Sequence, residues 1–224
     1  MSRISRFMIV LVVLGGMLAF FGFQEWRVSK GSTAKPIAVE LIDVEAGKAP
    51  ENNHWKLGES VALYNACVYE YEQSKYSNAE PDGETKINYC YYPIISKGHP
   101  FLVQLSTLVD KHGSIEAIPE AEVPAINNFA VLVKSRKFKV LGDIPNDWDV
   151  VPTTQGLVIN RIASLDKKEA DLLKNGFPGL NTDKLLLLEF DRRPASIVKI
   201  GGMMVGGAML ALGGVAAMFA KRNA

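Results

Sequence analysis

The sequence is 224 residues long, which allows one ordinary domain with some additional segments. Its formal net charge is only +1, and this balance argues against a nucleic-acid-binding protein, which usually carries a concentrated basic surface. Hydrophobic residues make up 48% of the chain, as in globular proteins, but residues 7–23 and 200–220 contain no charged residue at all. The two ends therefore differ in kind from the segment between them.

Residues 7–23 predict a first transmembrane helix, and residues 1–6 before it form a short tail that contains Arg3 and Arg6. Seventeen apolar residues at a rise of ~1.5 Å span roughly 26 Å, close to the thickness of the hydrocarbon core of a bilayer. A cleaved signal peptide also begins with basic residues and an apolar run. Bulky side chains, however, stand where signal peptidase needs small ones, and they are typical of an interfacial aromatic belt: Phe20, Phe21, Phe23 and Trp26. We therefore expect an uncleaved anchor.

Residues 24–36 are mostly small and polar and predict a linker, and residues 37–194 predict a β-rich domain outside the membrane. Runs rich in β-branched, aromatic and leucine residues predict its strands: Ile37–Ile42, Val61–Glu72, Ile87–Ile95, Phe101–Val109, Phe129–Leu141, Gly156–Ile162 and Leu185–Phe190. One helix is expected after Ser164, a good amino-terminal cap, and it ends near Gly176. The predicted fold class is α+β, with two transmembrane helices flanking a mainly antiparallel β domain that contains one short helix.

The two cysteines lie in the two strands with the strongest β signal, which flank a turn-rich loop at residues 77–83. If these strands pair around the centre of the loop, the numbers of opposed residues sum to 157, and Cys67 lies opposite Cys90. Opposed side chains in a non-hydrogen-bonded pair are close enough for a disulfide. A disulfide, which suits an oxidising compartment, and two reduced, buried thiols are the alternatives. A metal-bound or catalytic thiol is not expected, because no histidine stands at ligand spacing.

Residues 197–220 predict a second transmembrane helix, which a basic tail, residues 221–224, follows. The alternative is a buried helix of a soluble protein, but each of six glycines would weaken such a helix in water by ~1 kcal/mol relative to alanine. In lipid, small residues instead allow helices to approach closely. Small residues four positions apart predict helix-packing faces on both helices: Gly15, Ala19, Gly202, Gly206, Gly207 and Ala211. We expect that the two helices pack together, or that copies of the second helix pack on each other.

The charges of the two tails set the expected orientation. The tails contain Arg3, Arg6, Lys221 and Arg222, and basic residues favour the cytoplasmic side. Basic residues also flank the other ends of the helices, but long domains cross membranes largely regardless of such charges. We expect both termini in the cytoplasm and the domain outside it, in the periplasm if the membrane is a bacterial inner membrane. An organelle membrane is the alternative.

No catalytic, cofactor-binding or metal-binding motif is recognisable. The histidines have no nucleophile at a known spacing: His54, His99 and His112. The aspartates near Trp148 lack the ligand spacing of a calcium loop: Asp143, Asp147 and Asp149. The basic run at residues 134–139 predicts either contact with anionic lipid headgroups or the solvated face of an edge strand.

Four stretches resemble a group of uncharacterised two-helix membrane proteins that carry a β-rich domain between the helices: Lys35–Asp43, Asn53–Leu57, Tyr91–Ile95 and Leu188–Ser196. The same plan is similar to that of mitochondrial outer-membrane ubiquitin ligases, whose intermembrane domain is proposed to sense or bind partners. Those ligases carry a cytosolic RING after the second helix, and none follows here, so no ligase activity and no catalytic residues come with the resemblance. It implies a membrane-associated interaction module.

The preferred hypothesis is therefore a non-enzymatic interaction or scaffold module at the membrane surface, without a cofactor. Its expected partners are the lipid bilayer and another membrane protein, or a second copy of the chain bound through the glycine-rich helix; nucleic acid is not expected. The alternatives are an enzyme of the hydrolase type at the membrane surface and an accessory subunit of a larger membrane complex.

Overall fold

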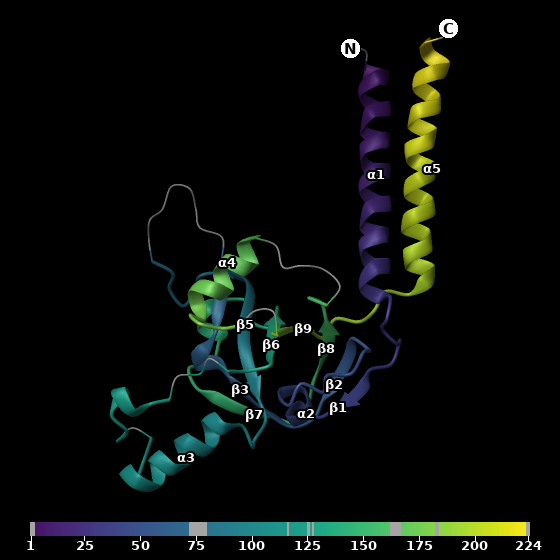
Figure 1. Ribbon diagram of the computed structural model, residues 1–224. Coiled ribbons are helices and arrows are strands. Elements are labelled where there is room, and N and C mark those ends of the chain that lie inside the picture. Colours follow the sequence, from purple (N-terminus) through teal and green to yellow (C-terminus); the bar gives the residue numbers. More distant parts are fainter. Residues whose placement is uncertain are drawn as a thin grey trace. The chain divides into compact units, whose positions relative to one another are not determined.

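The computed structural model describes residues 3–71, 80–115, 117–124, 126, 128–161, 167–181 and 184–222. The chain divides into two compact units. One unit is formed by Met1–Ala34 together with Arg193–Ala224, and the other by Lys35–Arg192. Figure 1 shows a pair of long helices in the first unit and a domain built on a β-sheet in the second.

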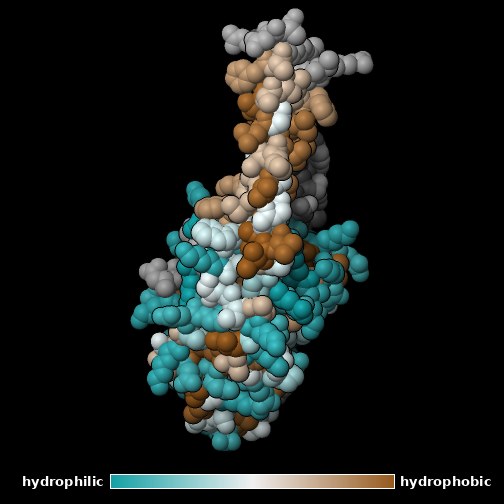
Figure 2. Space-filling view, turned by 90° about the vertical axis from the view of Figure 1, so that its right-hand side faces the viewer, coloured by the Kyte–Doolittle hydropathy of each residue, from teal (hydrophilic) through white to brown (hydrophobic). Residues whose placement is uncertain are grey.

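The first unit is an antiparallel pair of helices, α1 (Arg3–Ser29) and α5 (Ile197–Arg222), which lie side by side (Figure 1). The spans Phe7–Ser29 and Ile197–Ala220 are long and apolar enough to cross a membrane. Large apolar side chains stay on the outside of the pair, and Phe7 is 62% and Met209 71% exposed. In Figure 2 the helical column is accordingly brown over much of its surface. Such a continuous apolar surface is what a lipid environment requires and what water disfavours.

The first helix extends further than predicted, so the linker begins later than residue 24. Residues 24–29 contain neither glycine nor proline and therefore continue the helix. Gly31, with a left-handed φ of 82°, follows its end, as glycines often do at helix ends. The hydroxyl of Ser29 accepts a hydrogen bond of 2.9 Å from the backbone N–H of Ala195, which lies just before α5.

The second unit is built on one nine-stranded sheet. Its strands along the chain are β1 (Ile37–Val39), β2 (His54–Leu57), β3 (Ser60–Leu63), β4 (Val68–Tyr71), β5 (Ile87–Ile95), β6 (Val131–Ser135), β7 (Trp148–Val151), β8 (Thr154–Val158) and β9 (Leu186–Phe190). Their order in space is β1-β2-β8-β9-β6-β5-β3-β7, and β4 also pairs with β5. In the described part of the chain only the pairs β1–β2 and β6–β9 are parallel. The sheet is thus mainly antiparallel, and the predicted α+β class is confirmed.

Both faces of the sheet are packed, because successive side chains of a strand point to opposite faces. Tyr92 of β5 belongs to one buried cluster with Trp55, whereas its neighbour Tyr91 belongs to another with Leu187. The sheet is accompanied by α2 (Leu41–Glu45), α3 (Pro100–His112) and α4 (Lys167–Gly176), and by the 3-10 turns η1 (Tyr64–Ala66), η2 (Glu120–Glu122) and η3 (Leu141–Asp143). The fully buried Leu173 of α4 joins the second cluster.

The predicted strand at Phe101–Val109 is wrong, because these residues form most of α3. The helix begins where His99 caps it: the backbone N–H of Phe101 donates a hydrogen bond of 3.2 Å to Nδ1 of His99. Pro100 occupies the first helical position, which proline suits. Gly113, with a φ of 87°, ends the helix. These start and stop signals outweigh the β propensity of the apolar run.

Three further predicted strands are interrupted or shortened. The segment Ile37–Ile42 is a strand only to Val39, because α2 begins at Leu41. The segment Val61–Glu72 contains β3 and β4, with the turn η1 between them. The segment Phe129–Leu141 contains only β6, which ends at Ser135. The expected helix after Ser164 corresponds to α4, and its predicted cap lies outside the described residues.

Candidate functional site

The closest approach of α1 and α5 is made by glycines on both helices. A Cβ atom added to Gly15 would lie 2.5 Å from the backbone oxygen of Gly207 and 2.5 Å from the backbone nitrogen of Ala211. A Cβ atom added to Gly207 would lie 2.5 Å from the backbone nitrogen of Ala19. The structure therefore brings together four of the six residues singled out from the sequence, in a crossing where backbone contacts backbone.

Two further glycines extend this contact and were not predicted. A Cβ atom on Gly22 would lie 2.8 Å from the side chain of Met204, and one on Gly214 would lie 3.0 Å from the backbone oxygen of Met8. The spacing contained the signal, because Gly22 follows Gly15 by seven residues and Gly214 follows Gly207 by seven. Seven residues are nearly two helical turns, so each pair shares one face.

Gly202 and Gly206 face away from this contact. A Cβ atom added to either glycine meets nothing within 4 Å in the described chain, and the same is true of Gly213. At about 100° per residue these three glycines lie within roughly 40° of one another around α5. The second helix thus has two glycine faces: one packs on α1, and the other, which we call the open glycine face (Gly202, Gly206 and Gly213), is uncovered.

The two cysteines come together, but not as predicted. Tyr69, not Cys67, lies opposite Cys90 in the β4–β5 pair, so the predicted register is wrong by two residues. A bulge between Glu70 and Tyr71 shifts the pairing near the loop, which a symmetric hairpin does not allow for. Cys67 precedes β4 on the diagonal of Cys90, and diagonal neighbours on one face still reach each other. Both are free thiols, and their side chains are close enough for a hydrogen bond between the two sulfur atoms.

This hydrogen bond makes the two thiols unequal. It lowers the pKa of Cys67, which is only half-buried. The same bond, together with burial, raises the pKa of the fully buried Cys90. Because the thiolate is the reactive form of cysteine, the more reactive of the two thiols is that of Cys67.

We expect iodoacetamide to modify Cys67 at least about tenfold faster than Cys90 in the folded, reduced chain, because exposure and thiolate character both favour Cys67. A time course followed by peptide mass spectrometry measures both rates. In urea the two rates should converge. Equal modification rates of the two cysteines in the folded protein would contradict the assignment of Cys67 as the more reactive thiol. A parallel sample without reductant tests the predicted disulfide, which would leave both cysteines unmodified.

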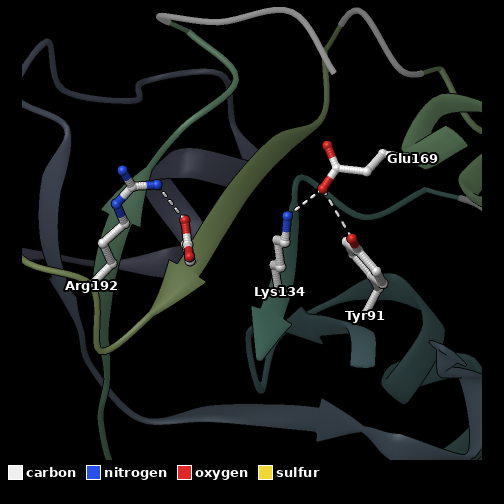
Figure 3. Close-up of polar contacts among 5 residues, drawn as sticks. Tyr91, Lys134, Glu169 and Arg192 are labelled. Carbon is white, nitrogen blue, oxygen red and sulfur yellow. Dashed lines mark hydrogen bonds and ion pairs between the residues drawn. The ribbon is translucent and has the colours of Figure 1, made fainter. Parts of the chain in front are cut away.

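A charged pair beneath α4 joins the helix to the sheet. The ammonium of Lys134 on β6 contacts the Glu169 carboxylate of α4, and the Tyr91 hydroxyl donates a hydrogen bond of 3.0 Å to the same carboxylate (Figure 3). The side chains of Lys134 and Glu169 are only 11% and 14% exposed. The ring of Tyr89 lies 4.0 Å from the Lys134 ammonium. For Lys134 the predicted solvated or lipid-contacting position is therefore wrong, since β6 lies between β5 and β9.

Three of the residues weighed for chemistry hold local structure: His99, His112 and Asp143. His99 accepts the capping hydrogen bond through Nδ1 and donates through Nε2 to the Asn128 backbone oxygen at 2.7 Å. His112, at the other end of α3, contacts the Glu122 carboxylate at 3.1 Å. Asp143 accepts hydrogen bonds from two backbone N–H groups of its own turn, which lower its pKa. Among the described residues no group of three or more acidic, histidine or cysteine side chains could hold a metal ion.

No family model matches this chain, and no curated protein and no solved structure matches it either.

Proposed function

We propose that this chain is a two-pass membrane protein whose domain serves as a non-enzymatic interaction or scaffold module at the membrane surface. The single observation that supports this proposal is the helix pair with an apolar exterior and a glycine-lined interior. In water the exterior would aggregate and the glycines would weaken each helix. In a bilayer both features are favourable, because lipid solvates the outside and small residues allow the backbones to touch.

The proposed topology follows from the antiparallel arrangement. Two spans return the chain to the side on which it started, so both tails lie on one side and Lys35–Arg192 on the other. The basic residues of the tails favour the cytoplasm for the tails. The domain then lies outside the cytoplasm, in the periplasm if the membrane is a bacterial inner membrane. The resemblance to two-helix membrane proteins with a β-rich intervening domain supports the same plan.

We place the binding site of the proposed membrane partner on the open glycine face. Because α1 covers Gly207 and leaves Gly202 and Gly206 free, a further helix can approach α5 without displacing α1. The partner is a second copy of the chain or another membrane protein. In this proposal the helices form the assembly and the domain presents the recognition surface.

Membrane extraction tests the proposal. We expect the full chain to stay in the membrane pellet after washing with alkaline carbonate and with urea at neutral pH, and to dissolve in detergent, because both spans are solvated by lipid. The neutral wash is needed because burial raises the pKa of Tyr92, so the unfolded domain loses tyrosine protons first and high pH destabilises the fold.

A membrane-impermeant maleimide reagent tests the topology in intact cells, before any wash. In a background with Cys67→Ser and Cys90→Ala, a cysteine replacing Lys97 should react from the extracytoplasmic side, whereas one replacing Ser2 should react only after the membrane is opened. Release of the intact chain by either wash would refute the two-pass proposal. Labelling of both positions from the same side would mean that α1 does not cross the membrane and would also refute the two-pass proposal. Labelling of the cysteine at position 2 from outside, with the cysteine at position 97 protected, would refute the orientation alone.

A further inference from the structure

The domain contains a cavity of about 630 Å³ that the chemistry described above does not use. Its walls come from the end of α2 and the turn after it, the start of α3, and the chain at one end of β6, β8 and β9. Cavities of a few hundred cubic ångströms are typical of sites for small molecules. Elements that are far apart in the sequence thus meet around one ligand-sized space.

Much of the wall is apolar and well fixed. Val44 of α2 and Phe129, just before β6, are both buried, and Leu186 of β9 lines the same space. The Phe129 ring packs against Phe177 with 5.2 Å between the ring centres. Such a wall suits the apolar body of a ligand.

Two polar groups of the wall already have partners. The Glu45 carboxylate accepts a hydrogen bond of 2.8 Å from the backbone N–H of Ser96 and a second one from the Ser96 hydroxyl. The two nitrogens of His99 are occupied by Phe101 and Asn128. Each oxygen of the Glu45 carboxylate thus already accepts one hydrogen bond, and His99 has no ring nitrogen left for a ligand.

The remaining charged groups of the wall are both cations, Arg161 and Lys184. Neither forms an ion pair with a carboxylate in the part of the chain that the structure describes. Arg161 is held in place by a hydrogen bond to the Pro50 carbonyl oxygen and by the Trp55 ring, whose centre is 5.4 Å away. Partial burial lowers the pKa of this guanidinium, although the residue as a whole is exposed. A bound anion would favour the charged form.

We propose that this cavity binds a small organic anion, with a carboxylate or phosphate head between Arg161 and Lys184 and an apolar body against Val44, Phe129 and Leu186. Arginine forks suit both head groups, and the lysine adds a second positive charge. The domain would then bind a soluble ligand at a site to which the membrane helices contribute no residue.

Binding of phenylacetate and phenyl phosphate to the full chain in detergent, followed by saturation-transfer NMR, tests this proposal. We expect saturable binding of at least one probe below about 10 mM, which corresponds to a few kcal/mol of binding free energy. Phenylacetamide, which has the same body without the charge, should bind about tenfold more weakly, because a charge-assisted hydrogen bond is lost. Acetate and inorganic phosphate should also bind more weakly, because they lack the apolar body.

Two variants and one control locate the site. Lys184→Gln and Arg161→Gln should each weaken binding by about tenfold, and the glutamine at 161 retains a donor for the Pro50 carbonyl oxygen. Lys56→Gln removes the same charge from an exposed position of β2 outside the cavity and should change binding less than about twofold. Lack of saturable binding of both probes, or equal effects of Lys184→Gln and Lys56→Gln, would overturn the proposal.

Discussion

Replacing Gly207 with isoleucine is expected to separate α1 from α5. The first atom of the new side chain would lie 2.5 Å from the Ala19 backbone nitrogen and 2.6 Å from the Gly15 backbone oxygen, and neither backbone group can rotate away. The helices must therefore move apart along the whole crossing. Overpacking of a tight contact costs about 1–3 kcal/mol, which corresponds to a loss of about fivefold to 150-fold in the population of the close pair.

Disulfide cross-linking measures this population. A Cβ atom on Gly22 would lie 3.0 Å from Cβ of Met203, so the helices need to part by only about half an ångström here for cysteines at these two positions to reach the Cβ–Cβ distance of a disulfide. In a background with Cys67→Ser and Cys90→Ala, Gly207→Ile should slow cross-linking by about tenfold. Gly206→Ile is the matched control, because it adds the same side chain one residue away on the open glycine face. It should leave the rate within about twofold.

The same two variants also separate the two expected roles of α5. If copies of the chain associate through the open glycine face, Gly206→Ile should weaken association in a membrane two-hybrid assay, whereas Gly207→Ile should reduce it less. Equal cross-linking rates for the two variants would refute the assigned helix rotation. An unchanged two-hybrid signal for Gly206→Ile would refute self-association through this face.

The sequence predicted the long helices and the fold class because these depend on coarse properties. Length and the absence of charge are enough to recognise a helix that can span a bilayer, and a high content of tyrosine and isoleucine is enough to recognise β5. The rotation of α5 about its own axis, by contrast, could not be predicted from the sequence. Gly206 and Gly207 are neighbours with the same propensity, and only contact with α1 distinguishes them.

The errors within the domain also have physical causes. The apolar run of α3 fits a strand as well as a helix, and the decisive signals were His99 and Pro100 at its start, which are easily read as a turn. The β4–β5 register depends on a bulge that no hydrophobic pattern records. The contact between Lys134 and Glu169 joins residues far apart in sequence, so no local pattern contains it. Strand registers and contacts between residues far apart in sequence can be identified only from the folded structure.

Removing the ammonium of Lys134 is the second substitution with a large expected effect. Lys134→Met keeps the apolar stem but removes the ammonium that contacts the Glu169 carboxylate, which is only 14% exposed. Breaking a largely buried pair by removing one partner costs about 3 kcal/mol, because the remaining charge stays desolvated. The expected result is a loss of about that size in the free energy of unfolding. Urea unfolding of the full chain in detergent, followed by tryptophan fluorescence, to which the buried Trp55 contributes, measures it.

Two further variants distinguish the ion pair from a general effect of charge. Lys97→Met breaks the exposed pair of Lys97 and Glu59, whose side chains are 57% and 51% exposed, and should cost less than about 1 kcal/mol. Lys134→Met combined with Glu169→Leu removes both buried charges, and it should recover most of the lost stability, because well-packed apolar residues can replace a buried pair. A double variant as unstable as Lys134→Met alone would contradict this, and would mean that the loss of the Tyr91 hydrogen bond to Glu169 costs as much as the removal of the second charge recovers.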